Sequence, residues 1–225
     1  MFSSIGKKLI VSATGIALVL FVIGHLLGNL TFFFGPDAMN GYALHLRDLG
    51  PLLWVARIGL IVAVGLHIYF TMLLWKENHA ARPSKYVYQS RVRSTVFART
   101  MRMTGLIVFA FVIFHLSHFT WQIIDHGYRD YHATVDGRPA HDVYRMVVVG
   151  FSVPLVSAFY VLSLGLLAFH LSHGIASLFQ TLGLNNQQLR PRFEIAGKTI
   201  ASALFLGFSS IPIAVLLGVG KEVLK

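Results

Sequence analysis

Residues 14–26 read TGIALVLFVIGHL, and residues 104–116 read TGLIVFAFVIFHL. The two stretches are ninety residues apart and share Thr-Gly, Phe-Val-Ile and His-Leu at the same spacing. Chance similarity between apolar segments could supply Phe-Val-Ile, but not Thr-Gly and His as well. Each stretch belongs to an apolar run that can cross a bilayer as a helix, which takes about 20 residues. The repeat therefore predicts two equivalent spanning helices, each with a histidine past its middle, His25 and His115.

The composition of the whole chain agrees with a membrane location. Of its 225 residues, 55% are hydrophobic and only 12% are charged, and the mean hydropathy is +0.66. A soluble domain carries about 25% charged residues. We therefore expect one integral membrane domain over residues 1–225, all-α, built as a bundle of five transmembrane helices. The expected spans are residues 9–34, 52–75, 101–124, 146–178 and 195–219, and the fourth should tilt or kink at Pro154.

The distribution of charge predicts the orientation of these spans. If the N-terminus is cytoplasmic, the inner segments hold twelve basic and two acidic residues, whereas the outer segments hold seven of each. Basic residues concentrate on the cytoplasmic side of membrane proteins, so the N-terminus should be inside and the C-terminus outside. This topology also explains the formal charge of +10, and no nucleic-acid partner is expected.

Two features of the sequence exclude other classes of protein. The chain has no cysteine, which excludes disulfides, cysteine-held iron–sulfur clusters and covalently attached c-type haem. It also lacks the glycine-rich fingerprints of nucleotide-binding loops. The apolar run after Lys7 and Lys8 continues to Phe34 without a small-residue cleavage site, so we interpret it as a retained helix, not a signal peptide.

Four histidines lie inside four different spans, where an ionisable side chain is costly and usually functional. With the predicted topology, His25 and His115 fall in the outer half of the membrane, and His67 and His170 fall in the inner half. The two levels should be separated by roughly 10–20 Å at the rise of an α-helix. This arrangement predicts two b-type haems, with His25 and His115 as axial ligands of one and His67 and His170 of the other.

A second repeat leaves the choice of ligand open at two positions. Residues 114–118 and 169–173 both read FHLSH, so His118 and His173 lie one turn beyond His115 and His170. The ninety-residue repeat favours His115, and the shared motif then favours His170. In that interpretation, His118 and His173 hydrogen-bond to neighbouring helices or to haem propionates. The swapped assignment remains the alternative.

The stretches FVIGHLLGN (residues 21–29) and FHLSHG (residues 169–174), with the histidine of the second span, carry a resemblance to a known family. They resemble the cytochrome b membrane anchor of succinate dehydrogenase and fumarate reductase, in its single-chain, five-helix, dihaem form. The resemblance covers nearly the whole chain in span number, ligand order, loop lengths and the basic inner loop. Cytochromes b of the bc complexes instead carry two ligands on each of two helices.

The resemblance implies a division of labour among several chains. It implies the membrane subunit of a succinate:quinone oxidoreductase of the respiratory chain and tricarboxylic acid cycle, in the cytoplasmic membrane of a prokaryote. A flavoprotein subunit would interconvert succinate and fumarate, and an iron–sulfur subunit would relay electrons. The anchor would exchange electrons with quinone, expected to be menaquinone, through its two haems.

Several polar residues are candidates for further contacts. Arginine suits bidentate pairing with carboxylates, so residues at the span ends could hold haem propionates. The inner candidates are Ser12, Arg99 and Arg102, and the outer candidates are Asn29, Arg57 and Arg145. The preferred quinone site is the first outer loop, with Tyr42, His45, Arg47 and Asp48, and its competitor is an inner site beside Trp75. The basic segment 76–102, with Tyr86 and Tyr88, is interpreted as a partner dock, a topology signal or both.

Two other functions compete with this interpretation. The first is the quinone-reactive anchor of another respiratory enzyme, such as a hydrogenase or formate dehydrogenase. The second is a transporter whose histidines bind a metal ion or protons. A transporter would gather its coordinating groups near the midplane, whereas here the histidines lie at two depths and the spans carry no deep carboxylate.

Overall fold

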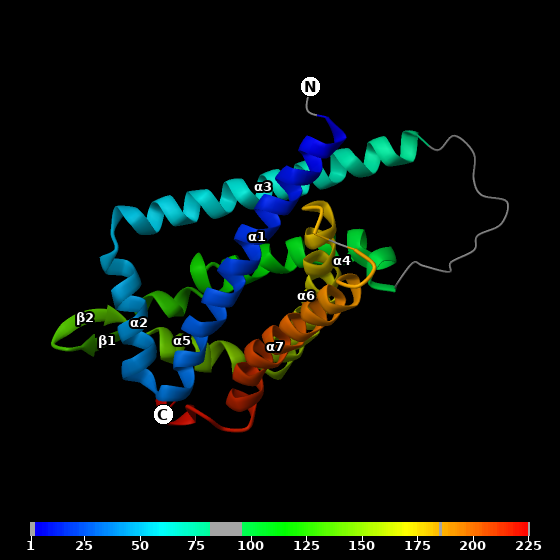
Figure 1. Ribbon diagram of the computed structural model, residues 1–225. Helices are drawn as coiled ribbons and strands as arrows, with labels where there is room; N and C mark the ends of the chain where they lie inside the picture. The colour runs from blue at the N-terminus through cyan, green and yellow to red at the C-terminus, as the bar shows by residue number, and fades with distance from the viewer. Residues whose placement is uncertain (1–2, 82–95, 185, 225) are drawn as a thin grey trace.

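The computed structural model describes residues 3–81, 96–184 and 186–224, with side chains of 96–99 excepted. Within these residues, five helices are long and apolar enough to cross a membrane, which makes the chain a candidate multi-pass membrane protein. They are α1 (Ser4–Asn29), α3 (Pro51–Ala80), α4 (Val96–His115), α6 (Pro154–Thr181) and α7 (Arg190–Leu216) (Figure 1). Short turns extend two of them: η1 (Leu30–Phe34) follows α1, and the π-helical η2 (Leu116–Thr120) follows α4.

Local sequence signals explain where the long helices begin. The side chain of Ser3 accepts a hydrogen bond from the backbone N–H of Gly6, 3.1 Å away, and so caps α1. Proline occupies the first turn of α3, α6 and α7, where its missing N–H costs nothing. The connection after α1 turns at Gly35, whose φ of 92° suits glycine.

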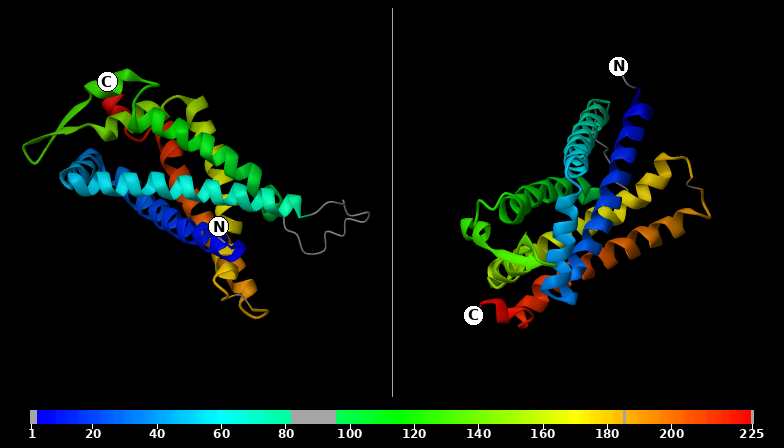
Figure 2. Two further views of the ribbon diagram at one scale, coloured as in Figure 1. Left: turned by 90° about the horizontal axis from the view of Figure 1, so that it is seen from above. Right: turned by 90° about the vertical axis from the view of Figure 1, so that its left-hand side faces the viewer.

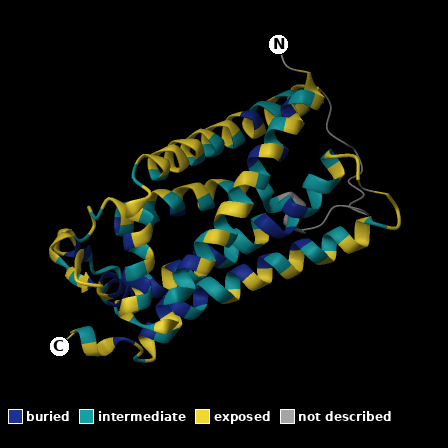
Figure 3. Cartoon of the chain, turned by 60° about the vertical axis from the view of Figure 1, so that its left-hand side comes forward, coloured by how far each residue is buried: buried dark blue, intermediate teal, exposed yellow. Residues whose placement is uncertain are grey.

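The helices pack as two pairs and a fifth member. Helix α1 packs against α3, α4 packs against α6, and α7 lies along α6 (Figure 2). Most side chains of α3 are exposed, and Phe70 is the buried residue of this helix. Figure 3 colours the chain by burial, and the exposed residues of α3 include large apolar side chains such as Trp54, Ile61 and Tyr69. Such a large apolar surface is rare on a water-soluble monomer and fits a helix that faces lipid.

A cap of short elements covers one end of the bundle. It contains α2 (Pro36–Asp48), η3 (His126–Asp130), the antiparallel strands β1 (His132–Val135) and β2 (Arg138–His141), α5 (Val143–Phe151) and η4 (Lys221–Leu224). Asp136 and Gly137 both have positive φ in the tight turn of the hairpin. Figure 1 places the C-terminus at this end and the N-terminus at the other.

Side-chain hydrogen bonds tie the cap together. Asn40 donates to the carboxylate of Asp142 at 3.0 Å and accepts from the backbone N–H of Tyr144 at 2.9 Å. Tyr144 stacks on Phe32 with ring centroids 5.0 Å apart, which joins α5 to the end of the first span. These contacts attach α2 and α5 to the bundle and hold the cap above it.

The structure corrects several expected boundaries. The first outer loop is a helix, α2, and the outer segment 125–142 contains a β-hairpin within the otherwise helical fold. The first span begins at Ser4, the second extends to Ala80, the third ends at Thr120, and the fifth runs from 190 to 216.

The expected fourth span, residues 146–178, is two helices, α5 and α6. The predicted kink at Pro154 is a complete break, because a residue that precedes proline disfavours helical geometry. Val153 is extended, with ψ of 110°. The hydroxyl of Ser157 donates to the carbonyl of Phe151 across the break at 2.6 Å and so pairs one of the carbonyls that it frees.

Candidate functional site

His25 of α1 and His115 of α4 lie together in the half of the bundle nearer the cap. Their ring centroids are 5.8 Å apart, and the rings are inclined by 78°. Two imidazoles that bind one metal ion at about 2.0 Å each have their ring centres about 6 Å apart. The separation of the two rings therefore suits one shared metal ion.

His67 of α3 and His170 of α6 each lie against a Thr-Gly pair of the neighbouring helix. The Nδ1 atom of His67 is 3.1 Å from the hydroxyl of Thr14. The Nδ1 atom of His170 is 3.4 Å from the hydroxyl of Thr104. Each threonine hydroxyl donates to a carbonyl one turn earlier in its own helix, so its oxygen accepts from the imidazole Nδ1–H.

The repeated glycines make room for these two rings. A Cβ atom on Gly15 would lie 3.6 Å from Cε1 of His67, and a Cβ atom on Gly105 would lie 3.1 Å from Cε1 of His170. Small residues on a spanning helix let a neighbouring group approach closely. The neighbour in the structure is the imidazole of the adjoining helix.

The two helix pairs are therefore built alike. Each ring also interacts with a backbone carbonyl, that of Val11 for His67 and that of Met101 for His170. These carbonyls are again ninety residues apart. His67 and His170 are also close enough to interact electrostatically with each other. The Thr-Gly level and the histidine level of α1 and α4 are eleven residues apart, which is about 16 Å of helix.

The hydrogen bonds of His118 distinguish it from His115. Its Nδ1 atom is 3.0 Å from the hydroxyl of Tyr160, and its Nε2 atom is 3.1 Å from the hydroxyl of Tyr128. Because both ring nitrogens have partners, His118 ties α4 to its neighbours, as one interpretation of the sequence predicted. Within the part of the chain that the structure describes, the hydrogen bond of His115 is made by Nδ1, which lies 3.4 Å from the hydroxyl of Tyr160. This difference favours His115 as the metal ligand.

Two imidazole nitrogens fit a metal cofactor in which the cofactor itself supplies most of the ligands. Side-chain hydrogen bonds hold Nδ1 of His67, His115 and His170, which leaves Nε2 for a metal, the usual arrangement for a ligating histidine. Among the described residues, no group of three or more His, Asp or Glu side chains converges on one point. Paired imidazoles without further ligands suit a haem, whose porphyrin supplies the other four donors.

The remaining members of the two histidine levels have distinct surroundings. The amide Nδ2 of Asn29 donates to the carbonyl of His25 at 2.7 Å and lies 3.4 Å from both nitrogens of that ring. His173 lies one turn beyond His170 and interacts electrostatically with Glu194 of α7. Sequence reasoning missed Tyr128 and Tyr160 as partners of the histidines, and nothing in the local sequence marks them.

The residues that the sequence suggested as partners of haem propionates each have their own contacts in the structure. Ser12 is buried in α1, and Asn29 lies beside His25. Three arginines lie over aromatic rings: Arg57 over Trp54, Arg102 over Trp75 and Arg145 over Tyr131, at 5.1, 4.5 and 4.8 Å from the ring centroids. Of these, the contact of Arg102 joins α3 to α4, and the ion pair of Lys7 with Glu77 joins α1 to α3 at the same end. The side chain of Arg99, together with Tyr86, Tyr88 and the rest of segment 82–95, lies outside the described residues.

Of the four residues predicted for quinone, three contact one of two neighbours, the helix α1 or the hairpin. The ring of Tyr42 packs against Gly28 of α1, where an added Cβ atom would be 2.6 Å from the hydroxyl oxygen. Arg47 and Asp48 instead bind the hairpin, and His45 is exposed. The Arg138 guanidinium donates two hydrogen bonds to Asp48, at 2.8 and 2.9 Å, and holds the pKa of that carboxyl below its ordinary value. Among the described contacts, Tyr42 is the member of this set that touches a histidine-bearing helix.

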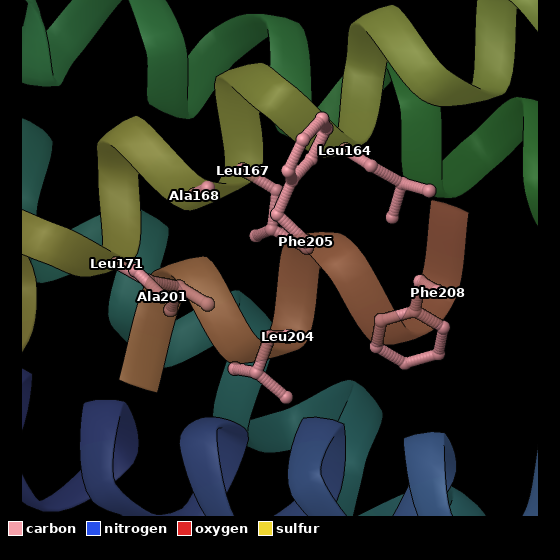
Figure 4. Close-up of a pocket in the computed structure, with 8 residues that line it drawn as sticks. All are labelled: Leu164, Leu167, Ala168, Leu171, Ala201, Leu204, Phe205 and Phe208. Carbon is pink, nitrogen blue, oxygen red and sulfur yellow. The ribbon is translucent and has the colours of Figure 1, made fainter. Parts of the chain in front are cut away.

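Helix α7 contributes an apolar wall and no histidine. Eight apolar side chains of α6 and α7, among them Leu167 and Phe208, line a shallow hollow between these helices (Figure 4). The ring of Phe208 also contacts that of His25, with centroids 5.7 Å apart.

The chain was compared with protein-family models, with curated proteins and with solved structures. None of the three comparisons gives a match.

Proposed function

We propose that the chain is a dihaem b-type cytochrome. His25 and His115 would be the axial ligands of one haem, and His67 and His170 those of the other. The observation that carries the proposal is the arrangement of these rings at two levels, with His25 against His115, His67 and His170 each against a Thr-Gly pair, and Nδ1 held by a hydroxyl at three of the four positions. This pattern orients the imidazole and leaves Nε2 to bind iron.

The residues of the chain prepare both levels for ligation. The threonines and Tyr160 accept from Nδ1 and so select the Nδ1–H tautomer of the rings that they contact, which leaves Nε2 unprotonated. Gly15 and Gly105 let the inner rings lie close to a helix backbone. A haem with two histidine ligands carries one electron at a time. Two such levels, about 16 Å apart along the helices, suit electron transfer across the apolar layer.

We propose further that this cytochrome is the membrane anchor of a succinate:quinone oxidoreductase. The proposal is supported by the resemblance of residues 21–29 and 169–174 to that family and by five candidate spans in the expected order. Because the chain has no cysteine, an iron–sulfur subunit and a flavoprotein subunit would carry the succinate and fumarate chemistry. Quinone, expected to be menaquinone, would exchange electrons with the haems.

The orientation is part of the same proposal. In the sequence, the basic excess falls in the N-terminal segment and in the connections after the second and fourth spans, so the end that holds the N-terminus would face the cytoplasm and the iron–sulfur subunit. The cap formed by α2, the hairpin and α5 would face the outer side of the cytoplasmic membrane of a prokaryote.

The first experiment is a redox-titrated visible spectrum of the purified chain in detergent, with haem measured per polypeptide. Two b-type haems with separable midpoint potentials are expected. A chain that binds no haem would refute the cytochrome. Affinity purification of the tagged chain from native membranes then tests the anchor, because flavoprotein and iron–sulfur subunits should copurify. Copurification of hydrogenase or formate dehydrogenase subunits would instead assign the cytochrome to another respiratory enzyme.

A further inference from the structure

A closed cluster of histidine and tyrosine side chains adjoins His115, which with His25 forms the outer level of the proposed orientation. Tyr128 of η3, His118 of η2 and Tyr160 of α6 are each 3% exposed or less. His118 lies between the two tyrosine hydroxyls, at 3.0 Å from Tyr160 and 3.1 Å from Tyr128. The hydroxyl of Tyr160 also lies 3.4 Å from Nδ1 of His115. A path of hydrogen bonds thus runs from Tyr128 through His118 and Tyr160 to His115.

The number of protons in this cluster determines the direction of its hydrogen bonds. A neutral imidazole has one N–H and one acceptor nitrogen, and a tyrosine hydroxyl has one O–H. If His115 binds metal through Nε2, its proton is on Nδ1 and is donated to the oxygen of Tyr160. The O–H of Tyr160 is then donated to Nδ1 of His118. His118 must therefore carry its own proton on Nε2 and donate it to Tyr128.

We propose that His118 and Tyr160 are positioning residues that set the tautomer and orientation of His115. The inference rests on the proposed role of His115 as an axial ligand. His118 keeps the proton of Tyr160 directed away from His115, so that the tyrosine oxygen accepts the Nδ1–H. The hydrogen bond makes the imidazole a stronger electron donor to its metal. His118 acts through Tyr160 and does not itself bind the metal.

The surroundings of the cluster hold this chain in one arrangement. Burial, together with the nearby Asp125 carboxylate and Tyr131, raises the pKa of Tyr128 to about 12. Tyr128 is therefore a neutral hydroxyl that accepts from His118 at ordinary pH. The ring of Phe119 lies on that of His118, with centroids 4.0 Å apart. A Cβ atom on Gly150 of α5 would be 2.9 Å from Phe119 and 3.1 Å from His118, so α5 closes over the cluster.

The test is a redox titration of the haem-loaded protein with Tyr160→Phe, which removes the hydroxyl and keeps the ring. The matched control is Tyr69→Phe, which alters an exposed tyrosine of α3. The midpoint potential of the outer haem should rise by about 59 mV, which for a one-electron couple is a tenfold shift toward the reduced form. The inner haem and the control should keep their wild-type midpoint potentials.

Further variants separate a positioning role from a general loss of packing. His118→Leu removes the acceptor for Tyr160 and should shift the outer haem upward, whereas His118→Asn keeps an acceptor oxygen there and should restore part of the shift. Tyr128→Phe should cause a smaller shift of the same sign. Loss of the outer haem alone in Tyr160→Phe would also support the inference.

The inference is overturned if the wild-type protein holds two haems and Tyr160→Phe and His118→Leu both leave the outer midpoint unchanged. It is also overturned if His118→Asn and His118→Leu shift that midpoint equally. Should Tyr160→Phe fail to fold, the two His118 variants and Tyr128→Phe decide the question. A wild-type chain without haem would instead refute the proposed function and, with it, this inference.

Discussion

The two histidine levels, called inner (His67 and His170) and outer (His25 and His115) after the proposed orientation, start from related sequences and reach different surroundings. At the inner level, His67 and His170 each receive the same three neighbours: a threonine hydroxyl, a glycine and a backbone carbonyl. At the outer level, His25 has the amide of Asn29 beside it, whereas His115 has Tyr160. The repeated helices therefore provide a symmetric inner site and an asymmetric outer one.

The difference shows how far an internal repeat determines a site. The threonine and glycine contacts at the inner level come from within the repeated stretch, because Thr14-Gly15 and Thr104-Gly105 are part of it. The partners at the outer level come from segments outside the repeat. Symmetry in the sequence is thus preserved only where both partners of a contact belong to repeated or equivalent helices.

The largest expected effect is the loss of one haem. His25→Ala and His115→Ala should each remove the same haem, whereas His67→Ala and His170→Ala should each remove the other, because each removes one of two axial ligands. Haem per polypeptide should fall from two to one in each variant, with a different spectral component remaining. If His25→Ala and His67→Ala instead abolished one shared component, the pairing by level would be wrong.

A smaller effect is expected from the glycines of the inner level. In Gly105→Ala the new Cβ atom would be 3.1 Å from His170, whereas in Gly15→Ala it would be 3.6 Å from His67. The first is tighter than an ordinary contact and should lower the affinity for the inner haem about tenfold, within the range seen when surroundings of a ligand are changed. Gly15→Ala is the matched control and should bind haem normally. If both variants retained haem equally, the absence of a side chain at Gly105 would not be needed for haem binding.

The packing of α6 and α7 provides a test of stability away from the histidines. In Gly197→Ala the new Cβ atom would be 2.7 Å from the backbone oxygen of Ser172. This clash should lower the free energy of unfolding by about 1–3 kcal/mol, as overpacking does. In Gly165→Ala the nearest atom, on Phe205, would be 3.7 Å away, so stability should be unchanged or slightly higher. Thermal unfolding in detergent measures the difference between the two variants.

The smallest effect is expected at the surface of the cap. Asp48 has a pKa below its ordinary value of 3.8 because of the Arg138 guanidinium. Since its pKa is lower in the folded protein, the ion pair stabilises the cap above pH 3.8 and this stabilisation is lost as pH falls through the folded value. Asp48→Asn should therefore differ slightly from wild type at neutral pH and converge with it in acid. A difference that persisted at pH 2 would assign the effect to packing.

The sequence predicted the helical spans and the two histidine levels better than it predicted the connections. Hydropathy marked all five spans, because apolar runs of that length have few alternatives to a membrane helix. The helix α2 was interpreted as a loop, because its 13 residues are too few to cross a membrane and only spanning segments were sought. The hairpin was missed because its strands are only four residues long.

The candidate site divides in the same way. The ninety-residue repeat is sufficient to identify His25, His115 and the Thr-Gly pairs. It does not identify Tyr128 or Tyr160, because both depend on segments that lie beyond the repeat and meet His118 only after the chain folds back. The proposed quinone residues were grouped by their proximity in sequence, but α2 turns Arg47 and Asp48 toward the hairpin.

The sequence alone determined the membrane class, the order of the spans and the position of each histidine along its helix. These properties depend on the number of apolar residues and on the helical rise, which local sequence sets. The tertiary structure decided which atoms each imidazole contacts and which nitrogen remains available. That choice depends on hydrogen-bond partners from distant segments, such as Tyr160 for His115, and their approach is set by how the helices and the cap pack together.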